Sequence, residues 1–226
     1  MKPKRLACTI WIIGVLLLPS PTWAQSTPGT APETGILPPM IPIFPLDDVM
    51  LFPNISRPLH IFEPRYRAMV ADALKGDRII GMVLLRPGYE ADYEGRPPVY
   101  PIGCAGVITD AEPLPDGRYA IVLRGLVKFR ITGEDQSRAY RLARVEAMHE
   151  VLTDEELGAL RKQRQRLEAL LVSVAPSSPS PALSDEDLVN GLAQFLDLHP
   201  VERQELLEKE GTLSRSQALI ELLEMK

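Results

Sequence analysis

The run HIFEPRY at residues 60–66 holds three side chains that could do acid–base chemistry. His60 and Glu63 could exchange a proton with a substrate, and Arg65 could hold an anion beside them. A hydrolase would also need an activated nucleophile, and the run contains no candidate for one. We therefore favour a structural interpretation, in which Glu63 lies at the start of a helix and pairs with Arg65 or another cation while the apolar residues pack.

Histidine and cysteine are too scattered in this sequence to indicate a metal centre. The three histidines and Cys104 fall in different segments, without a paired spacing such as C-x-x-C or H-E-x-x-H. Cys104 lies in the apolar run 102–108 and is predicted to be a buried core thiol, because a reactive thiol needs a nearby cation and access to solvent. We predict no metal site, no cofactor and no catalytic residue.

The segment 86–101 is a stronger candidate for binding. It places Tyr89, Tyr93 and Tyr100 among acidic residues, and at about 16 residues it is longer than most loops. Long loops often carry binding residues, and tyrosine gives contact area at a low entropic cost. We predict that these three tyrosines bind peptide, the alternative being a solvent loop with no binding role.

The charge of the chain argues against nucleic acid as a partner. Without residues 1–24 the chain keeps 22 Lys and Arg against 30 Asp and Glu, a net charge of −8. Such a surface is poorly suited to neutralising phosphates. The densest basic run, 161–166, is surrounded by acidic helical partners, so we interpret it as a solvated helix face; the alternative is an RNA or anionic-lipid contact.

The first 24 residues are typical of a secretory signal. A basic start is followed by the apolar stretch 6–18 and by Thr22-Trp23-Ala24, which suits cleavage. The apolar stretch has about 13 residues, fewer than the roughly 17 to 25 that span a bilayer. We predict export to the periplasm or beyond with cleavage near Ala24; the alternative is an uncleaved tether, the one membrane contact expected. Residues 25–39 are rich in Pro, Thr, Ser and Gly, which predicts a disordered linker.

Residues 40–148 have the pattern of short strands around one helix. Prolines, aspartates and asparagines separate apolar runs at 41–44, 49–52, 59–62, 78–85, 102–111, 119–123, 126–131 and 138–147. Helical spacing follows Pro64, and Gly76 is a suitable stop. Asp116-Gly117 between two of the runs predicts a hairpin. These features favour a small barrel or folded sheet over a parallel α/β layer.

Residues 149–226 have a helical pattern. Thr153 and Glu156 form a capping box for the first helix, and the run 176–181 breaks it. Ser184 opens a second helix with Leu188, Leu192, Phe195 and Leu196 on its apolar face, Pro200 opens a third that ends at Gly211, and Ser214 with Gln217 caps a fourth. One apolar face on each helix predicts a small bundle, packed on itself or on the barrel.

Several linked stretches resemble the amino-terminal substrate-binding domain of the Lon protease family. They are IPIFPLDDVMLFP (41–53), PLHIFEPRYRAMVADALKGDRIIGMVLL (58–85) and IGCAGVITDAEPLPDGRYAIVLRGLVKFRI (102–131), with 195–224 similar to the helical part of that domain. The motif residues, which we interpret as structural, are Phe44, Pro45, Leu46, Phe52, Pro53, His60, Phe62, Glu63, Arg65, Tyr66, Gly103, Asp116, Gly117, Arg118 and Gly125. Asn54, Lys128 and His199 depart from the usual family residues.

The resemblance implies an α+β fold and a binding function. The fold would be a PUA-like β pseudo-barrel with one inserted helix (40–148), followed by a carboxy-terminal helical bundle (149–226). In the protease such a domain recognises unfolded or tagged protein, so the expected partners of this chain are unfolded or extended polypeptide segments. The exposed strand edges predicted for an open barrel offer a second mode, in which an extended peptide adds main-chain hydrogen bonds. The chain lacks the G-x-x-x-x-G-K-[ST] motif that holds ATP phosphates. We predict an exported, non-catalytic peptide-binding accessory of envelope protein quality control; the alternatives are a hydrolase near His60 and Glu63 and a PUA-like RNA binder.

Overall fold

The fold is taken from a computed structural model that describes residues 37–92, 95–171 and 183–225. The predicted signal (1–24), most of the predicted linker (25–39), the proline-rich run 176–181 and Tyr93 lie outside these ranges. In the described part of the chain, no helix has the length and apolar character needed to cross a membrane.

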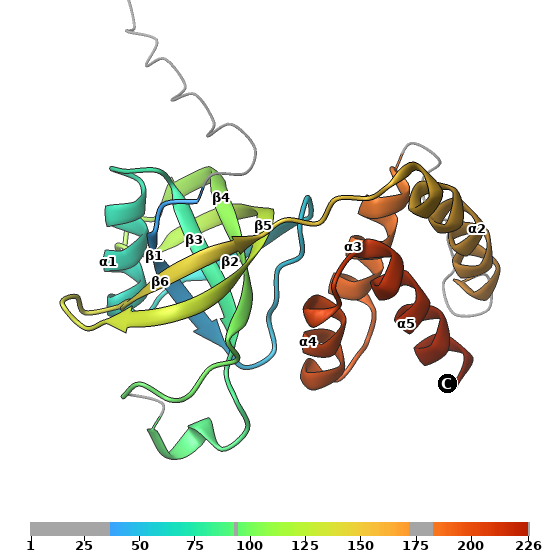
Figure 1. The fold of residues 1–226 in the computed structure, drawn as a ribbon. Coiled ribbons are helices and arrows are strands. Elements are labelled where there is room, and N and C mark those ends of the chain that lie inside the picture. The colour runs from blue at the N-terminus through green and yellow to red at the C-terminus, as the bar shows by residue number, and fades with distance from the viewer. Residues whose placement is uncertain (1–36, 93–94, 172–182, 226) are drawn as a thin grey trace, which may run out of the picture. The chain divides into compact units, whose positions relative to one another are not determined.

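In the part of the chain that the structure describes, six strands form one mixed sheet, which Figure 1 labels. They are β1 (Met40–Leu46), β2 (Ser56–Ile61), β3 (Ile79–Leu84), β4 (Ile102–Pro113), β5 (Tyr119–Asp135) and β6 (Arg141–Met148), in the order β2-β5-β4-β3-β1-β6. The β1–β3 pair is parallel and the other pairs are antiparallel. Because β6 pairs with β5 as well as with β1, the pairings run in a ring that leaves β2 outside it, attached to β5.

Within the described ranges, five α-helices and one short 3-10 turn accompany the sheet, which makes the fold α+β. Helix α1 (Pro64–Ala73) lies beside the strands in Figure 1, and α2 (Asp154–Leu171), α3 (Asp185–Phe195), α4 (Pro200–Glu208) and α5 (Thr212–Glu224) follow the last strand. The 3-10 turn η1 covers Tyr89–Asp92. The chain therefore has the order of elements that the sequence predicts, with strands first and a group of helices after them.

One hydrophobic core joins the sheet to the carboxy-terminal helices. It contains strand residues such as Phe44 and Ile80 together with Leu160 of α2, Leu206 of α4 and Leu219 of α5. A second, smaller cluster around Phe129 packs between strands of the ring. Because the two parts share buried apolar surface, the helices stabilise the sheet that carries the surface described below.

The helix starts test the capping predictions. Thr153 and Glu156 form the predicted capping box, with the Thr153 amide 2.8 Å from a Glu156 carboxylate oxygen. The Ser184 hydroxyl accepts from the Asp187 amide at 3.0 Å and caps α3. The predicted cap at Ser214 is wrong, because α5 already begins at Thr212 after Gly211. Thr212 is buried and its hydroxyl donates to the Glu150 carboxylate at 3.1 Å, which holds the first turn of α5 in place.

Two strand predictions need correction. The run 49–52 is not a strand, although Met50, Leu51 and Phe52 are buried. Its apolar side chains enter the core from a loop whose Phe52 amide is satisfied by the side chain of Gln194 instead of by a neighbouring strand. The runs 119–123 and 126–131 are one continuous strand, since Gly125 lies within β5 and does not end it. The predicted Asp116-Gly117 hairpin turn is present, with Gly117 at φ 79°.

Candidate binding surface

Strand β2 presents an unpaired outer edge. Among the described strands it pairs with β5 alone. The Gly125 amide donates to the Ile55 carbonyl at 2.9 Å, which fixes the alternation of the ladder. By that alternation, the backbone groups of Ser56, Pro58 and His60 point away from β5. Pro58 has no amide hydrogen to lose at this position, in keeping with the preference of proline for strand edges.

Part of this edge is already occupied by the chain itself. The Gln194 side chain donates to the Ser56 carbonyl at 3.3 Å and accepts from the Phe52 amide at 2.9 Å. The Pro58 carbonyl and the amide and carbonyl of His60 have no hydrogen-bond partner among the described residues. The edge can therefore form main-chain hydrogen bonds with one short extended segment.

Two exposed aromatic side chains lie at the two ends of β2. Phe62 follows the strand and is 62% exposed, and Phe195, the last residue of α3, is 60% exposed. The Arg57 guanidinium lies 5.0 Å from the centre of the Phe195 ring, which places Phe195 beside the start of β2. The sequence interpretation that these phenylalanines pack inside is wrong. Phe195 ends its helix beyond the packed turn, and Phe62 precedes the first turn of α1.

A shallow hollow lies next to β2 on the face of the sheet. Its volume is about 360 Å³, and it is lined by Pro58, Leu59 and His60 of β2, Asp110 and Glu112 of β4, and Ala120, Ile121 and Val122 of β5. The register places Pro58, Val122 and Asp110 in one cross-strand row and His60, Ala120 and Glu112 in the next. The small Ala120 between longer neighbours produces the depression.

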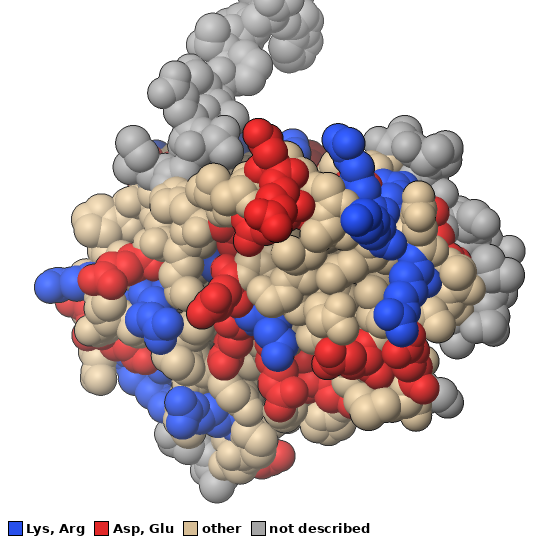
Figure 2. Space-filling view, turned by 45° about the vertical axis from the view of Figure 1, so that its right-hand side comes forward, with Lys and Arg blue, Asp and Glu red and all other residues tan. Residues whose placement is uncertain are grey.

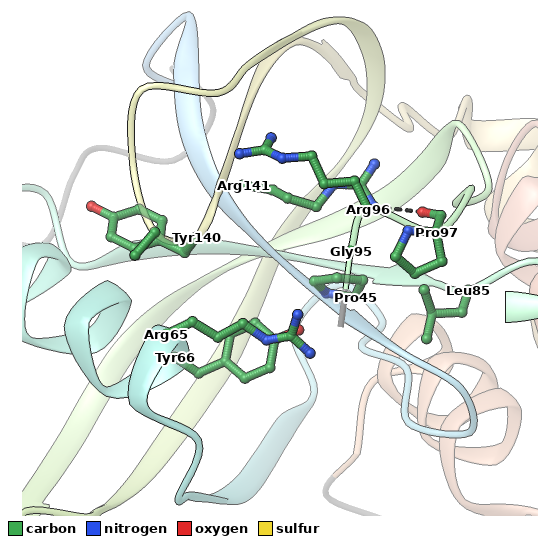
Figure 3. Close-up of a pocket in the computed structure, with 10 residues that line it drawn as sticks. Pro45, Arg65, Tyr66, Leu85, Gly95, Arg96, Pro97, Tyr140 and Arg141 are labelled. Atoms are coloured by element: carbon green, nitrogen blue, oxygen red, sulfur yellow. Dashed lines mark hydrogen bonds between the residues drawn. The ribbon is translucent and has the colours of Figure 1, made fainter. Parts of the chain in front are cut away.

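A second cavity, shown in Figure 3, is lined by three arginines, two of which are paired with carboxylates. It has a volume of about 200 Å³ and includes Arg65, Arg96 and Arg141. Arg65 pairs with Glu63 at 2.9 Å, as the sequence predicts. Arg141 pairs with Glu134 and donates to the Pro97 carbonyl at 2.7 Å. These contacts fix the guanidinium groups of Arg65 and Arg141 within the fold. They favour a structural role for the residues that line the cavity.

Of the three tyrosines predicted to bind peptide, the structure describes two. The Tyr89 hydroxyl donates to an Asp47 carboxylate oxygen at 2.7 Å. The Tyr100 ring packs against the core and lies 5.5 Å from the Arg86 guanidinium. Both side chains are held by contacts within the chain. A peptide-binding role for Tyr89, Tyr93 and Tyr100 stays a prediction.

Comparison with known proteins identifies the family. A model of the ATP-dependent protease La (LON) substrate-binding domain matches residues 40–225. The chain belongs to this family. The Lon substrate-binding domain thus accounts for both the strands and the helices described above, and the sequence resemblance is confirmed.

Lon proteases are also among the similar proteins. The chain is 27% identical over 216 residues to the Lon protease of Anaeromyxobacter dehalogenans strain 2CP-C, covering 90% of this chain and 26% of that protein. It is 28% identical to Lon protease 2 of Myxococcus xanthus, covering 90% of this chain and 25% of that protein. The chain thus spans about a quarter of the length of these relatives.

Solved amino-terminal domains of Lon share the fold. The N-terminal domain of the Mycobacterium avium complex Lon protease superposes with a TM-score of 0.62 at 19% identity, covering 82% of this chain and 98% of that domain. The Lon N-terminal domain protein from Xanthomonas campestris gives 0.57 at 22% identity, covering 80% and 97%.

Most Lon motif residues have structural positions here. The Phe44 and Tyr66 rings pack in a tilted arrangement with centres 4.4 Å apart, and Phe52 is fully buried. The Asp116 carboxylate accepts from the Arg118 backbone amide at 3.1 Å, and the Arg118 side chain lowers the pKa of that carboxyl. The remaining positions are in strands or turns: Pro45 and Leu46 in β1, Pro53 after the buried loop, Gly103 in β4, Gly117 in the hairpin turn and Gly125 in β5. His60 and Phe62 differ, because both side chains are exposed.

The acid–base pair considered for a hydrolase has other partners. The His60 ring lies 6.4 Å from the Phe62 ring in an edge-on arrangement, whereas the Glu63 carboxylate holds Arg65. Burial raises the pKa of the Cys104 thiol to about 12, so this cysteine is a protonated core residue at neutral pH.

A buried charge cluster joins the sheet of this Lon domain to its helices. Glu150, which follows β6, lies 2.7 Å from Lys128 of β5 and 2.5 Å from Arg215 of α5. Lys128 and Arg215 are 1% and 0% exposed, so their charges depend on this carboxylate. Burial by itself would raise the pKa of Glu150, but attraction and hydrogen bonds from Arg215 and Lys128 outweigh it and lower the pKa.

Several residues of the binding surface and of the buried charge cluster carried no sequence signal. Gln194 and Arg215 are polar residues whose burial depends on partners far along the chain, Phe52 and Glu150. Asp110 and Glu112 resemble ordinary exposed strand residues until the register places them opposite Val122 and Ala120. The exposure of Phe195 follows from its position as the last residue of α3, which the spacing of apolar residues did not indicate.

Replacement of Gln194 by leucine is expected to lower the free energy of unfolding by about 1–3 kcal/mol, because the buried Phe52 amide would lose its partner. Urea denaturation followed by circular dichroism measures the change. The matched control is Gln217→Leu, at an exposed glutamine whose side chain donates to Glu221, and it should change stability little. Equal effects in the two variants would contradict the bridging role of Gln194.

Proposed function

We propose that this chain is a non-catalytic module that binds extended, apolar polypeptide segments. The observation that carries the proposal is the free outer edge of β2 between exposed Phe62 and Phe195. An extended segment can bond to the Pro58 carbonyl and the His60 backbone while its side chains contact the two rings. Aromatic side chains of this kind are often the energetic centres of an interface.

Family membership supports binding over catalysis. The matched domain is named for substrate binding, and it is distinct from the ATPase and protease domains of Lon. The relatives extend over roughly four times the length of the matched segment, so their proteolytic activity is not carried over. In Figure 2 the basic side chains of the visible face stand in separate groups with acidic ones between them, which favours a protein over RNA as the partner.

The aromatic surface can be tested with a permanently unfolded protein. The double variant Phe62→Ser, Phe195→Ser should bind reduced, carboxymethylated α-lactalbumin at least tenfold more weakly than the unchanged protein, because two central aromatic contacts are lost. Fluorescence anisotropy of the labelled α-lactalbumin measures the affinity.

The control removes apolar side chains elsewhere that are even more exposed. Val151 and Met225 are 84% and 76% exposed, and Val151→Ser, Met225→Ser should leave the affinity unchanged. If both double variants bound equally well, or if the unchanged protein did not bind unfolded α-lactalbumin, the proposed function would be wrong.

We further propose that the protein is exported and serves envelope protein quality control. We also propose that the sheet is a PUA-like pseudo-barrel. The signal-like pattern of residues 1–24 supports export. The ring of strand pairings through β5, β4, β3, β1 and β6 supports the pseudo-barrel. Cell fractionation of the full chain tests export: recovery with the cytoplasmic fraction, at the unprocessed mass, would contradict it.

A further inference from the structure

We propose that the hollow beside β2 selects polypeptide segments in which a lysine or arginine lies next to a large apolar side chain. The inference rests on the proposed function, since it assigns a chemistry to the segment bound there. It comes from the side chains that line the hollow and from their positions in the sheet.

The floor of the hollow fits an apolar side chain. Ala120 and Val122 of β5 form its centre, Pro58 of β2 continues it, and the volume is about 360 Å³. Each of these residues is at least partly exposed. An apolar side chain of a bound segment would remove this surface from water without meeting a buried polar group.

The far side of the hollow is acidic. Asp110 and Glu112 are exposed, and the register places them opposite Val122 and Ala120. Adjacent strands lie about 4.8 Å apart, so a cation over the carboxylates would lie one side-chain spacing from an apolar group over Ala120. Among the described residues that line the hollow there is no lysine or arginine. The hollow therefore complements a positive group.

The nearby cations do not cancel this charge within the hollow. Arg118 is paired with Asp116 at 2.5 Å. Arg124 is exposed on the same face one pleat beyond Val122, opposite Val107 and Ser56, and so outside the lining. Arg124 would still repel a bound cation from this neighbouring position, so its removal should favour a basic segment, the opposite of removing a carboxylate.

The occupant crosses β2 onto the face of the sheet. A strand added to the β2 edge would lie about 10 Å from the centre of the hollow, two strand spacings away. The residues of the bound segment that fill the hollow are therefore not the ones that pair with the β2 edge. They come directly before or after the paired residues. Phe62, beside His60, lies at one end of this path.

Two fluorescein-labelled peptides test the selection. They share their apolar residues and length, and the lysines of one are glutamates in the other. The unchanged full-length protein should bind the lysine peptide about three- to tenfold more tightly, as expected for two exposed carboxylates. In Asp110→Asn, Glu112→Gln the preference should disappear, and 0.5 M NaCl should weaken it in the unchanged protein. Arg124→Gln should increase it.

A control variant tests whether the preference depends on the position of the carboxylates, and a second variant tests the apolar floor of the hollow. Glu205→Gln, Glu210→Gln removes two exposed carboxylates at the helical end of the chain and should retain the preference. Ala120→Leu fills the floor of the hollow and should weaken both peptides at least threefold. A native circular dichroism spectrum of each variant shows that the fold is kept.

The outcomes separate this inference from the proposed function. If unfolded α-lactalbumin is bound but the two peptides bind equally, or if the preference survives Asp110→Asn, Glu112→Gln, the hollow does not select basic segments and the binding function stands. If neither α-lactalbumin nor either peptide is bound, both the proposed function and this inference are overturned.

Discussion

Replacement of Glu150 by glutamine is expected to lower the free energy of unfolding by about 3–5 kcal/mol. The carboxylate faces two buried cations, Lys128 at 2.7 Å and Arg215 at 2.5 Å. Glutamine would keep the size of the side chain and remove its charge. Both cations would then remain buried without a counter-charge, although Lys128 still donates to the Lys209 carbonyl and Arg215 to the Leu206 carbonyl.

Urea denaturation of the full chain, followed by far-ultraviolet circular dichroism, measures this effect. The matched control is Glu168→Gln, which breaks the more exposed pair between Glu168 and Arg164 and should cost about 1 kcal/mol or less. A loss at Glu150 as small as the loss at Glu168 would mean that water reaches the cluster and that the helices are not held to the sheet by it.

The stabilising effect of Glu150 should also depend on pH. Its pKa in the folded protein lies below the ordinary value near 4.5. The stabilisation is therefore fully present above about pH 4.5 and is lost as the pH falls through the lowered pKa. The difference in unfolding free energy between the unchanged protein and Glu150→Gln should accordingly narrow on acidification. A difference that stayed constant down to acid unfolding would contradict the assignment.

Replacement of Gly125 by alanine is expected to destabilise the fold by about 3 kcal/mol or more. A Cβ atom at this position would lie 2.0 Å from the Phe52 carbonyl oxygen and 2.8 Å from the Phe52 carbonyl carbon. Because the obstacle is backbone, no rotation of a side chain can relieve the clash. The loop 49–53 would have to move away from β5, and the Gly125 amide would lose its bond to Ile55.

The control for this variant is Gly158→Ala. Gly158 lies in α2, and a Cβ atom there would meet nothing within 4 Å. Alanine should stabilise the helix by about 0.5–1 kcal/mol. Thermal unfolding of both variants measures the contrast; an unchanged melting temperature for Gly125→Ala would show that the close approach of Phe52 to β5 is not needed by the fold.

The local sequence patterns predicted most of the elements and few of the contacts between them. The hairpin at Asp116-Gly117 and the helix starts at Thr153 and Ser184 were predictable because their signals involve residues next to one another. The prediction at 49–52 was wrong because apolar residues are buried equally well in a strand or in a loop. The loop is chosen over the strand by the hydrogen bond that the Phe52 amide donates to Gln194, more than a hundred residues away.

By itself, the sequence determined the family, the order of strands and helices, and the burial of Cys104, since each depends on local composition or on linked motifs. The tertiary structure alone decided which strand kept a free edge, which phenylalanines became exposed, and which carboxylates came to share a hollow. These features depend on pairing between distant segments. The register of β4 and β5 places Asp110 opposite Val122 and Glu112 opposite Ala120. No local pattern encodes how β2 is aligned with β5 beside them.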